Sequence, residues 1–487
     1  MNGFRKLTPL NLVIILFFIV SCDSSTSPPA FQNGGIGQNS PGPACKAMVS
    51  NSILSELKSE LEYVRRESEA HLHKMSDQFP DFGGVYIDDN GTYTILLTDL
   101  EGKKTVKTAF SVEGFAKTRS GSVALDVNIR KAEHRFRDLA MWRELATAFL
   151  LAGNQFHYVL STQVHEAENR VAIGIDAAYW SGEVLDEVTE FLIHTLEVPQ
   201  NALLFEKEYA EIDEDANIFE NLNGDTFDRQ RPILGGLRIQ YGSGNCSMGF
   251  LGVYDGEDIF VTNGHCTENA HGTSATLYYQ GERDEPYDVV GVEIADGPQS
   301  LDMCVSPNSD CWPCRWSDSA IVRIRENVER ARGYIARTEW KSETWTVEGS
   351  REIDEADPVF AVIDLKEDIL MGMTLHKVGG NSGWTSGEVI RTCVDSRRTR
   401  HEMILQCQFR ARYATSGGGT SGSPVFKRVA FDIDGIQNPV ALVGIHRASS
   451  NRDQANGYSA FSPINGVLKD FEELEGLTIE TESDINE

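Results

Sequence analysis

The chain has 487 residues, which is too long for one ordinary domain, and 40% of them are hydrophobic, which is enough to build a core. Its formal net charge of −29 argues against a nucleic-acid partner, because phosphate groups are bound by a basic protein face. We interpret the acidity as a contribution to solubility.

The first residues have the pattern of an export signal. A basic pair precedes the apolar run 10–20, which is too short for a comfortable membrane span. The run ends in Ser21-Cys22, which resembles the lipobox of bacterial lipoproteins. The resemblance implies a signal peptide over 1–21 and a lipid on Cys22 that anchors an exported protein to a membrane, in the periplasm or at the cell surface. A flexible spacer over 22–44 would follow, and a free secreted protein is the alternative.

Residues 45–210 alternate between helical and strand patterns and predict an α+β half. The periodicities predict helix 44–79, hairpin 84–98, helix 134–152, strand 170–175, helix 183–196 and strand 202–206. The hairpin prediction is based on Asn90-Gly91, a pair that favours a tight turn between strands. No paired catalytic groups are found in this half.

The remainder of the chain has a different pattern. An acidic stretch rich in Asn and Asp predicts a linker over 211–232. From Ile233 onward, short strands alternate with glycine-rich turns about every ten residues, as is typical of an all-β barrel or sandwich. Helix is expected again only near 466–474.

Three residues in this second half are suited to nucleophilic catalysis. Ser421 stands in the run Gly417-Gly-Gly-Thr-Ser-Gly-Ser-Pro424, where glycines allow backbone N–H groups to point at one developing oxyanion. His265, which follows an apolar strand, can take the serine proton, and Asp318 heads another apolar strand and can orient the ring. Ser423 fits the glycine frame less well than Ser421.

These motifs resemble those of the chymotrypsin-like serine proteases. Gly264-His265-Cys266 is similar to the Ala-His-Cys box of that family, and Asp318-Ser-Ala-Ile-Val resembles its Asp-x-Ala-Leu strand. Gly419-Thr-Ser-Gly-Ser-Pro424 is similar to Gly-Asp-Ser-Gly-Gly-Pro, and the order His, Asp, Ser is that of chymotrypsin. The stretches 379–389 and 461–464 are similar to the bacterial α-lytic protease and streptogrisin type, so the resemblance covers about 233–476.

The resemblance implies a fold and an activity. The fold would be a double six-stranded β-barrel over 233–487, preceded by an α+β pro-region over 45–210 that assists folding and then inhibits, as in a zymogen. The activity would be that of a monomeric serine endopeptidase that cleaves proteins or peptides without a cofactor or metal. Ser421 would be the nucleophile, His265 the base and Asp318 its orienting carboxylate, and the N–H groups of Gly419 and Ser421 would form the oxyanion hole.

The substrate preference is less well defined. Thr415 stands where trypsin has an aspartate, so a preference for Lys or Arg is not expected. His446 and Arg447 would favour an acidic side chain if they line the pocket, and the alternative is a pair outside it. Thr420 replaces the aspartate that pairs with a freed N-terminus in the animal enzymes, so Ile233 is not expected to make that ion pair.

Eight cysteines follow Cys22, and an even set in an oxidising compartment predicts disulfides. By resemblance Cys246 pairs with Cys266, and Cys393 and Cys407 can staple the hairpin that they flank. The others are expected in a disulfide loop rather than in a metal or redox site, and their pairing is open: Cys45, Cys304, Cys311 and Cys314.

Two other functions stay open. A surface lipoprotein could keep the barrel for binding without catalysis, and an esterase could use the same triad.

Overall fold

The computed structural model describes residues 66–101, 127–151, 155–209, 225–298, 312–429, 436–450 and 457–472, with gaps at 243, 269–271, 282–288, 345, 399–402 and 415–418, and a few short pieces such as 212–213. The expected signal peptide, the spacer, the lipidation site Cys22, the pocket residue Thr415 and three of the cysteines, Cys45, Cys304 and Cys311, lie outside the described residues. Within the described part, no helix is both long and apolar enough to cross a membrane.

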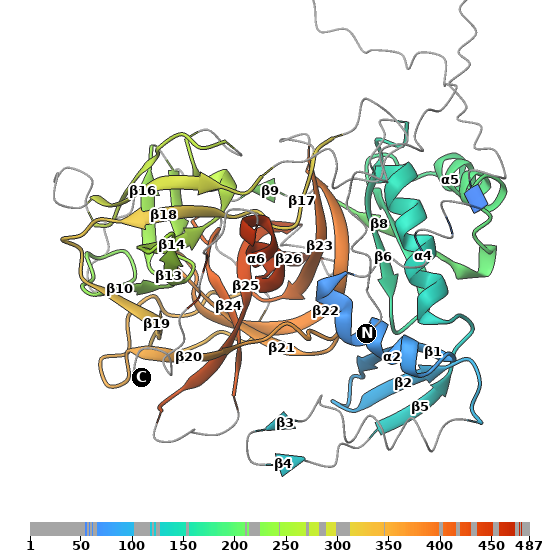
Figure 1. The fold of residues 1–487 in the computed structure, drawn as a ribbon, viewed down its shortest axis with the longest axis horizontal. Coiled ribbons are helices and arrows are strands. Elements are labelled where there is room, and N and C mark those ends of the chain that lie inside the picture. The colour runs from blue at the N-terminus through green and yellow to red at the C-terminus, as the bar shows by residue number, and fades with distance from the viewer. Residues whose placement is uncertain are drawn as a thin grey trace, which may run out of the picture.

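The N-terminal half is α+β, as the sequence predicts (Figure 1). Its main elements are η3 Glu67–Glu69, α2 Ala70–Gln78, β1 Phe82–Ile87, β2 Tyr93–Leu97, β5 Val127–Lys131, α4 Phe136–Ala146, η4 Thr147–Leu151, β6 Val159–His165, β7 Arg170–Asp176, α5 Gly182–His194, η5 Gln200–Ala202 and β8 Leu203–Glu208. β1 and β2 form the predicted antiparallel hairpin, and β5 lies parallel to β2. The apolar side of α4, which includes Leu139 and Leu145, is fully buried in one core with Val171 of β7 and Leu192 of α5.

The predicted continuous helix over 44–79 is wrong at Arg66. Arg66 has an extended backbone, with φ −90° and ψ 129°, and helix α2 begins only at Ala70. The Arg66 side chain is 2% exposed and ion-pairs with Glu144 and Asp395. Arg66 is therefore extended where its side chain enters a buried cluster of charges, and the apolar spacing used for the prediction carries no information about that cluster.

The C-terminal half is built almost entirely from strands, as expected. Its elements are β10 Ile233–Gly235, β11 Arg238–Tyr241, β12 Gly244–Ser247, β13 Leu251–Tyr254, β14 Glu257–Thr262, η6 Gly264–Cys266, β15 Leu277–Tyr279, β16 Val289–Asp296, β17 Cys314–Arg315, β18 Ala320–Ile324, β19 Arg330–Ala336, β20 Val359–Leu365, β21 Thr374–Gly379, β22 Gly383–Arg398, β23 Met403–Arg412, β24 Pro424–Arg428, β25 Pro439–Ser450, β26 Tyr458–Pro463 and α6 Ile464–Glu472.

The strands form two large sheets in the described part of the chain. One has seven strands in the order β12-β11-β15-β16-β18-β14-β13. The other has fourteen strands and contains most of the later strands together with β6, β7 and β8 of the N-terminal half. Within the second sheet, six strands of the C-terminal half close into a ring, since each pairs with the next in the order β21, β22, β23, β26, β25, β24 and β24 pairs back with β21. Among the described residues the seven-stranded sheet is an open path from β12 to β13, so the expected pair of six-stranded barrels is not confirmed.

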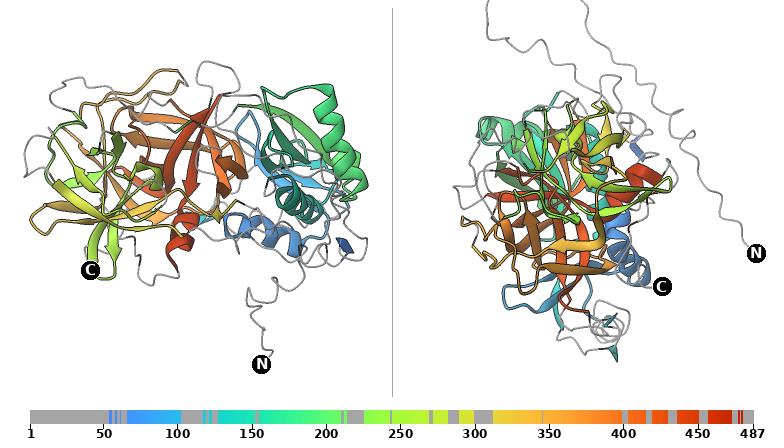
Figure 2. Two further views of the ribbon diagram at one scale, coloured as in Figure 1. Left: turned by 90° about the horizontal axis from the view of Figure 1, so that it is seen from above. Right: turned by 90° about the vertical axis from the view of Figure 1, so that its left-hand side faces the viewer.

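The two halves lie side by side and share this second sheet (Figures 1 and 2). β6 pairs antiparallel with β22, with Thr162 opposite Asp395 and Ser161 opposite Ser396. The expected linker 211–232 also contacts the barrel, since the short strand β9, Ile212–Asp213, pairs with β25. Thr226 is fully buried and donates its hydroxyl proton to Gly380 O.

Candidate active site

His265 and Asp318 are brought together by two neighbouring strands. β14 and β18 pair antiparallel with Thr262 opposite Ala320, so the segments that carry His265 and Asp318 lie at the same end of the sheet. His265 Nδ1 lies 2.7 Å from Asp318 Oδ2, and the His265 backbone N–H donates to Asp318 Oδ1 at 3.1 Å. Both residues are buried, at 4% and 0% exposure. A carboxylate in this position fixes the orientation of the ring and stabilises a proton gained by the imidazole.

The loop before β18 is fixed from three sides. Asn263 Nδ2 donates to Asp318 O at 2.6 Å, and the Asp318 N–H donates to Ser462 Oγ at 3.0 Å. Asp470 of α6 accepts the Ser317 N–H at 2.7 Å. The carboxylate that faces His265 is therefore held rigidly in place by residues of β26 and α6.

A second buried ion pair lies beside the first. Arg315 Nη1 lies 3.0 Å from Asp296 Oδ1, and both side chains are nearly inaccessible to solvent. Burial raises the pKa of Asp296 to about 6, although the Arg315 guanidinium acts to lower it. A Cβ atom on Gly264 would lie only 2.8 Å from Asp296 Oδ1 and 3.2 Å from Asp318 Oδ1, so a larger residue before His265 would require the Asp296 carboxylate to shift.

Ser421 stands in a loop that only glycines can form at two positions. Gly419 and Gly422 have φ values of +78° and +88°, in the left-handed region that glycine adopts readily. The backbone N–H groups of Gly419 and Ser421, the two expected oxyanion donors, have no acceptor among the described residues. Ser421 is fully buried, and its hydroxyl donates to Arg447 O at 3.2 Å rather than to the His265 ring.

Ser247 connects this loop to the strand before His265. Its N–H donates to Ser421 O at 2.7 Å, and its hydroxyl donates to Gly419 O at 2.9 Å. Its own carbonyl oxygen accepts the Thr262 hydroxyl at 3.0 Å. The loop that carries Ser421 and the end of β14 are thus tied together through one residue.

The two expected disulfides are formed. Cys246 is bonded to Cys266, which ties β12 to the turn that carries His265, and Cys393 is bonded to Cys407 between β22 and β23. Cys314 is also disulfide-bonded. Because Cys246 and Cys266 are oxidised, they offer no thiolate to a metal ion, although both lie next to His265.

The two expected pocket residues on β25 have different partners. His446 Nδ1 lies 3.4 Å from the Tyr413 hydroxyl, and both side chains are fully buried. Arg447 Nε donates to Gln408 Oε1 at 3.1 Å, and the same oxygen accepts the Ser462 hydroxyl at 2.8 Å. Arg447 is therefore part of the network behind Asp318, whereas His446 contacts Tyr413, and both side chains are fully buried.

Sequence reasoning did not single out the residues that hold this arrangement. Their hydrogen-bond partners include residues between 39 and 172 positions away along the chain, so no local motif could have indicated them. One further residue, Arg398, contacts the Asp318 carboxylate itself. The residues missed are Ser247, Arg398, Gln408, Ser462 and Asp470.

Comparisons with known proteins give a structural likeness only. No protein-family model matches the chain, and no curated protein matches it. Thermobifida fusca Protease A is similar over 51% of this chain and 98% of its own, with 18% identity and a TM-score of 0.33. A glutamic acid specific serine protease, described as using a histidine triad in substrate binding, covers 51% of this chain and all of its own, with 22% identity and a TM-score of 0.33. An α-lytic protease homolog covers 51% of this chain and 99% of its own, with 18% identity and a TM-score of 0.33. At these values, the chemistry has to be inferred from the residues of the site.

Proposed function

We propose that the protein is a serine endopeptidase that cleaves peptide bonds through an acyl-enzyme. The observation that carries the proposal is the buried pair His265–Asp318, with 2.7 Å between Nδ1 and Oδ2, tied through Ser247 to a glycine-framed serine. An imidazole that is oriented by a buried carboxylate is suited to take a proton from a hydroxyl and to return it to a leaving group.

In the proposed reaction, Ser421 Oγ attacks the carbonyl carbon of the scissile bond while His265 Nε2 takes its proton. The N–H groups of Gly419 and Ser421 stabilise the oxyanion, and His265 then protonates the departing amine. Water hydrolyses the acyl-enzyme by the reverse use of the same groups. In this reaction Ser421 Oγ gives up its hydrogen bond to Arg447 O, and catalytic hydrogen bonds often tighten only when substrate is bound.

We further propose that the uncut chain is an inactive precursor. β9 pairs with Ala448 and Ser449 of β25, directly after Arg447, whose carbonyl oxygen accepts the Ser421 hydroxyl. A substrate that adds to the same edge as an extended strand would have to displace β9. The N-terminal half would thus inhibit the barrel until the segment that joins the two halves is cut or β9 is released from β25.

An acidic side chain before the scissile bond is the proposed preference. His446 is the residue that supports it, since Arg447 is hydrogen-bonded to Gln408. A panel of peptides that differ only in the residue before the cut tests the preference. Equal or faster cleavage after Leu or Ala than after Glu contradicts it.

Export and a lipid anchor at Cys22 are proposed from the sequence pattern of residues 10–22. The alternative is a free secreted protein. Mass spectrometry of the native protein decides between them, because a lipidated chain begins at Cys22 and carries the mass of its acyl chains.

A fluorophosphonate probe tests the catalytic proposal. We expect covalent labelling on the Ser421 peptide, loss of labelling in S421A, and retention in the matched control S423A. Peptide hydrolysis should fall by about 10⁴-fold in S421A or H265A. Wild-type protein that stays unlabelled over pH 5–9, with or without its N-terminal half, contradicts the proposal.

Two rival functions would give different results. A non-catalytic binding protein, which the Ser421–Arg447 hydrogen bond favours, would not be labelled in any form. An esterase would be labelled and would hydrolyse activated esters, but it would leave peptides of every sequence uncut.

A further inference from the structure

Arg398 faces the same carboxylate oxygen that His265 contacts. Arg398 Nη1 lies 3.4 Å from Asp318 Oδ2, and His265 Nδ1 lies 2.7 Å from that atom. Arg398 is the last residue of β22 and is 3% exposed, and Asp318 is fully buried. The carboxylate is therefore shared between an imidazole and a guanidinium in a place that water hardly reaches.

We propose that Arg398 is a positioning residue of the His265–Asp318 pair. Its guanidinium fixes the Asp318 carboxylate and reduces the stabilisation that this carboxylate gives to a protonated His265. The inference rests on the proposed function for its catalytic meaning, although the charge arrangement itself can be measured without catalysis.

The physical argument concerns the charge that His265 would gain. A negative carboxylate stabilises the imidazolium, and a positive group within about 4–6 Å of the carboxylate opposes part of that effect. In a buried site such opposition is screened little by salt. With Arg398 present, His265 should therefore stay neutral, and able to accept a proton, at lower pH than it would beside Asp318 alone.

Other charged groups pack around the pair and are expected to act as a fixed background. Arg315 ion-pairs with Asp296 at 3.0 Å, Arg447 is hydrogen-bonded to Gln408, and Asp470 accepts backbone N–H groups of the loop before Asp318. Arg398 contacts the Asp318 carboxylate directly. The charged groups that form this background are Arg315, Arg447, Asp296 and Asp470.

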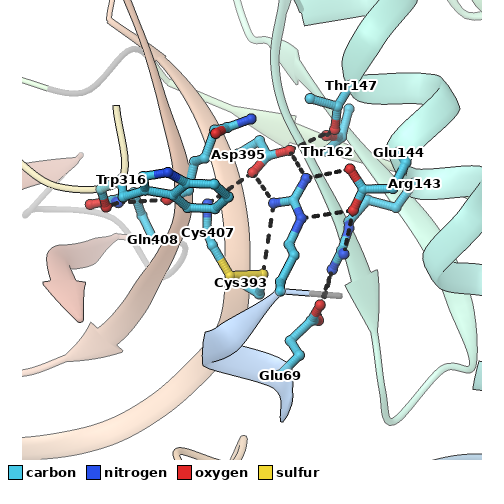
Figure 3. Close-up of polar contacts among 12 residues, drawn as sticks. Glu69, Arg143, Glu144, Thr147, Thr162, Trp316, Cys393, Asp395, Cys407 and Gln408 are labelled. Atoms are coloured by element: carbon cyan, nitrogen blue, oxygen red, sulfur yellow. Dashed lines mark hydrogen bonds and ion pairs between the residues drawn. A yellow bond between two sulfur atoms is a disulfide. The ribbon is translucent and has the colours of Figure 1, made fainter. Parts of the chain in front are cut away.

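The N-terminal half helps to hold the strand that carries Arg398. Asp395, three residues before Arg398, pairs with Thr162 across the shared sheet. The Asp395 carboxylate accepts a hydrogen bond from Arg66 Nη2 at 2.9 Å and another from the Thr147 hydroxyl at 2.6 Å (Figure 3). The end of β22 is thus fixed on one side by the N-terminal half and reaches Asp318 on the other.

The experiment compares R398Q, which removes the charge, with R398K, which keeps it, in the full chain. The matched control is R391Q, because Arg391 lies on the same strand and pairs with Glu206 away from Asp318. The titration of His265 is followed by NMR of ¹⁵N-histidine-labelled protein, with its signal assigned by loss in H265Q. The pH dependence of fluorophosphonate labelling is measured in parallel.

We expect the R398Q midpoint to rise by about one pH unit in both measurements, and the R398K and R391Q midpoints to stay within a few tenths of wild type. A merely structural role of Arg398 would lower the yield or the melting temperature without moving the midpoint. If R398Q does not fold, R398M replaces it as the neutral variant, because methionine keeps the length of the aliphatic part of the arginine side chain.

An unchanged His265 midpoint in a folded neutral variant overturns the inference. Failure of the proposed function looks different: the NMR midpoint still moves in R398Q, but no form of the protein is labelled by the probe.

Discussion

Glu166 follows β6 directly and is buried against β22, where it accepts the Thr392 hydroxyl proton. Burial raises the pKa of Glu166 to about 7, although the hydrogen bond from Thr392 acts to lower it. Between pH 4.5 and about 7, the folded chain therefore keeps a proton on Glu166 that the unfolded chain has released. The free energy of unfolding should fall with rising pH across this window.

E166Q should remove that contribution. We expect the melting temperature of wild type, measured relative to E166Q, to drop by roughly 2–4 °C from pH 5 to pH 8. The control is E168Q, which changes an exposed carboxylate two residues away. Its melting temperature should change with pH as that of wild type does. If the melting temperatures of wild type and E166Q change equally with pH, Glu166 ionises at its ordinary pKa.

Single residues with a local motif could be predicted from the sequence, and residues without one could not. His265, Asp318 and Ser421 stand in short patterns, and the structure joins the first two directly. Glu166 and Arg398 are acidic and basic residues in unremarkable surroundings. Their roles come from partners 226 and 80 residues away, which no spacing rule connects.

Among the elements, β9 has the most direct consequence for maturation. It runs antiparallel to β25 with Asp213 opposite Ala448, so the chain at Asp213 heads toward Arg447 and the Ser421 hydroxyl. We expect self-cleavage within about three residues after Asp213, because β9 points toward the proposed nucleophile at its last described residue.

Mass spectrometry of the new N-terminus measures the position of that cut. S421A should stay uncut, and the matched control S423A should be cut as in wild type. A first residue at or near Ile233 would point instead to a different protease that acts at the expected linker end.

Elements that depend on apolar periodicity were predicted well, and elements made by pairing were not. The hairpin at Asn90-Gly91 and helices α4 and α5 follow from turn residues and buried apolar stripes. Strand β6 was not expected, because its buried side chains include Ser161, Thr162 and Gln163, which no hydrophobicity pattern assigns to a core. It is a strand because β7 and β22 supply partners on both sides.

At the scale of the whole molecule, the two halves are joined by buried charges. Arg66 contacts Asp395 and Glu144, and Arg143 contacts Glu69 and Glu144 (Figure 3). Burial alone would raise the pKa of Glu144, but the two guanidinium groups lower it to about 2. Removing one member of such a cluster leaves an uncompensated buried charge.

R66M should therefore destabilise the folded chain by about 3–5 kcal/mol. R137M is the matched control, because Arg137 forms an exposed pair with Asp77 at 2.9 Å, and it should change stability by less than about 1 kcal/mol. Urea unfolding of the full chain, followed by tryptophan fluorescence, measures both. Equal midpoints for R66M and wild type would mean that the cluster adds nothing to the association of the halves.

The shared sheet also determines what a cut between the halves can achieve. Breaking one peptide bond leaves every backbone pair between β6 and β22 in place, together with the Arg410–Glu208 ion pair, at 2.7 Å. Departure of the N-terminal piece would remove the Arg66 guanidinium from the Asp395 carboxylate. It would also expose the edge of β22 that pairs with β6 to water and to other chains. A nicked molecule should accordingly persist as a slowly dissociating two-piece complex, and the lifetime of that complex, more than the cut itself, would set when the barrel becomes accessible.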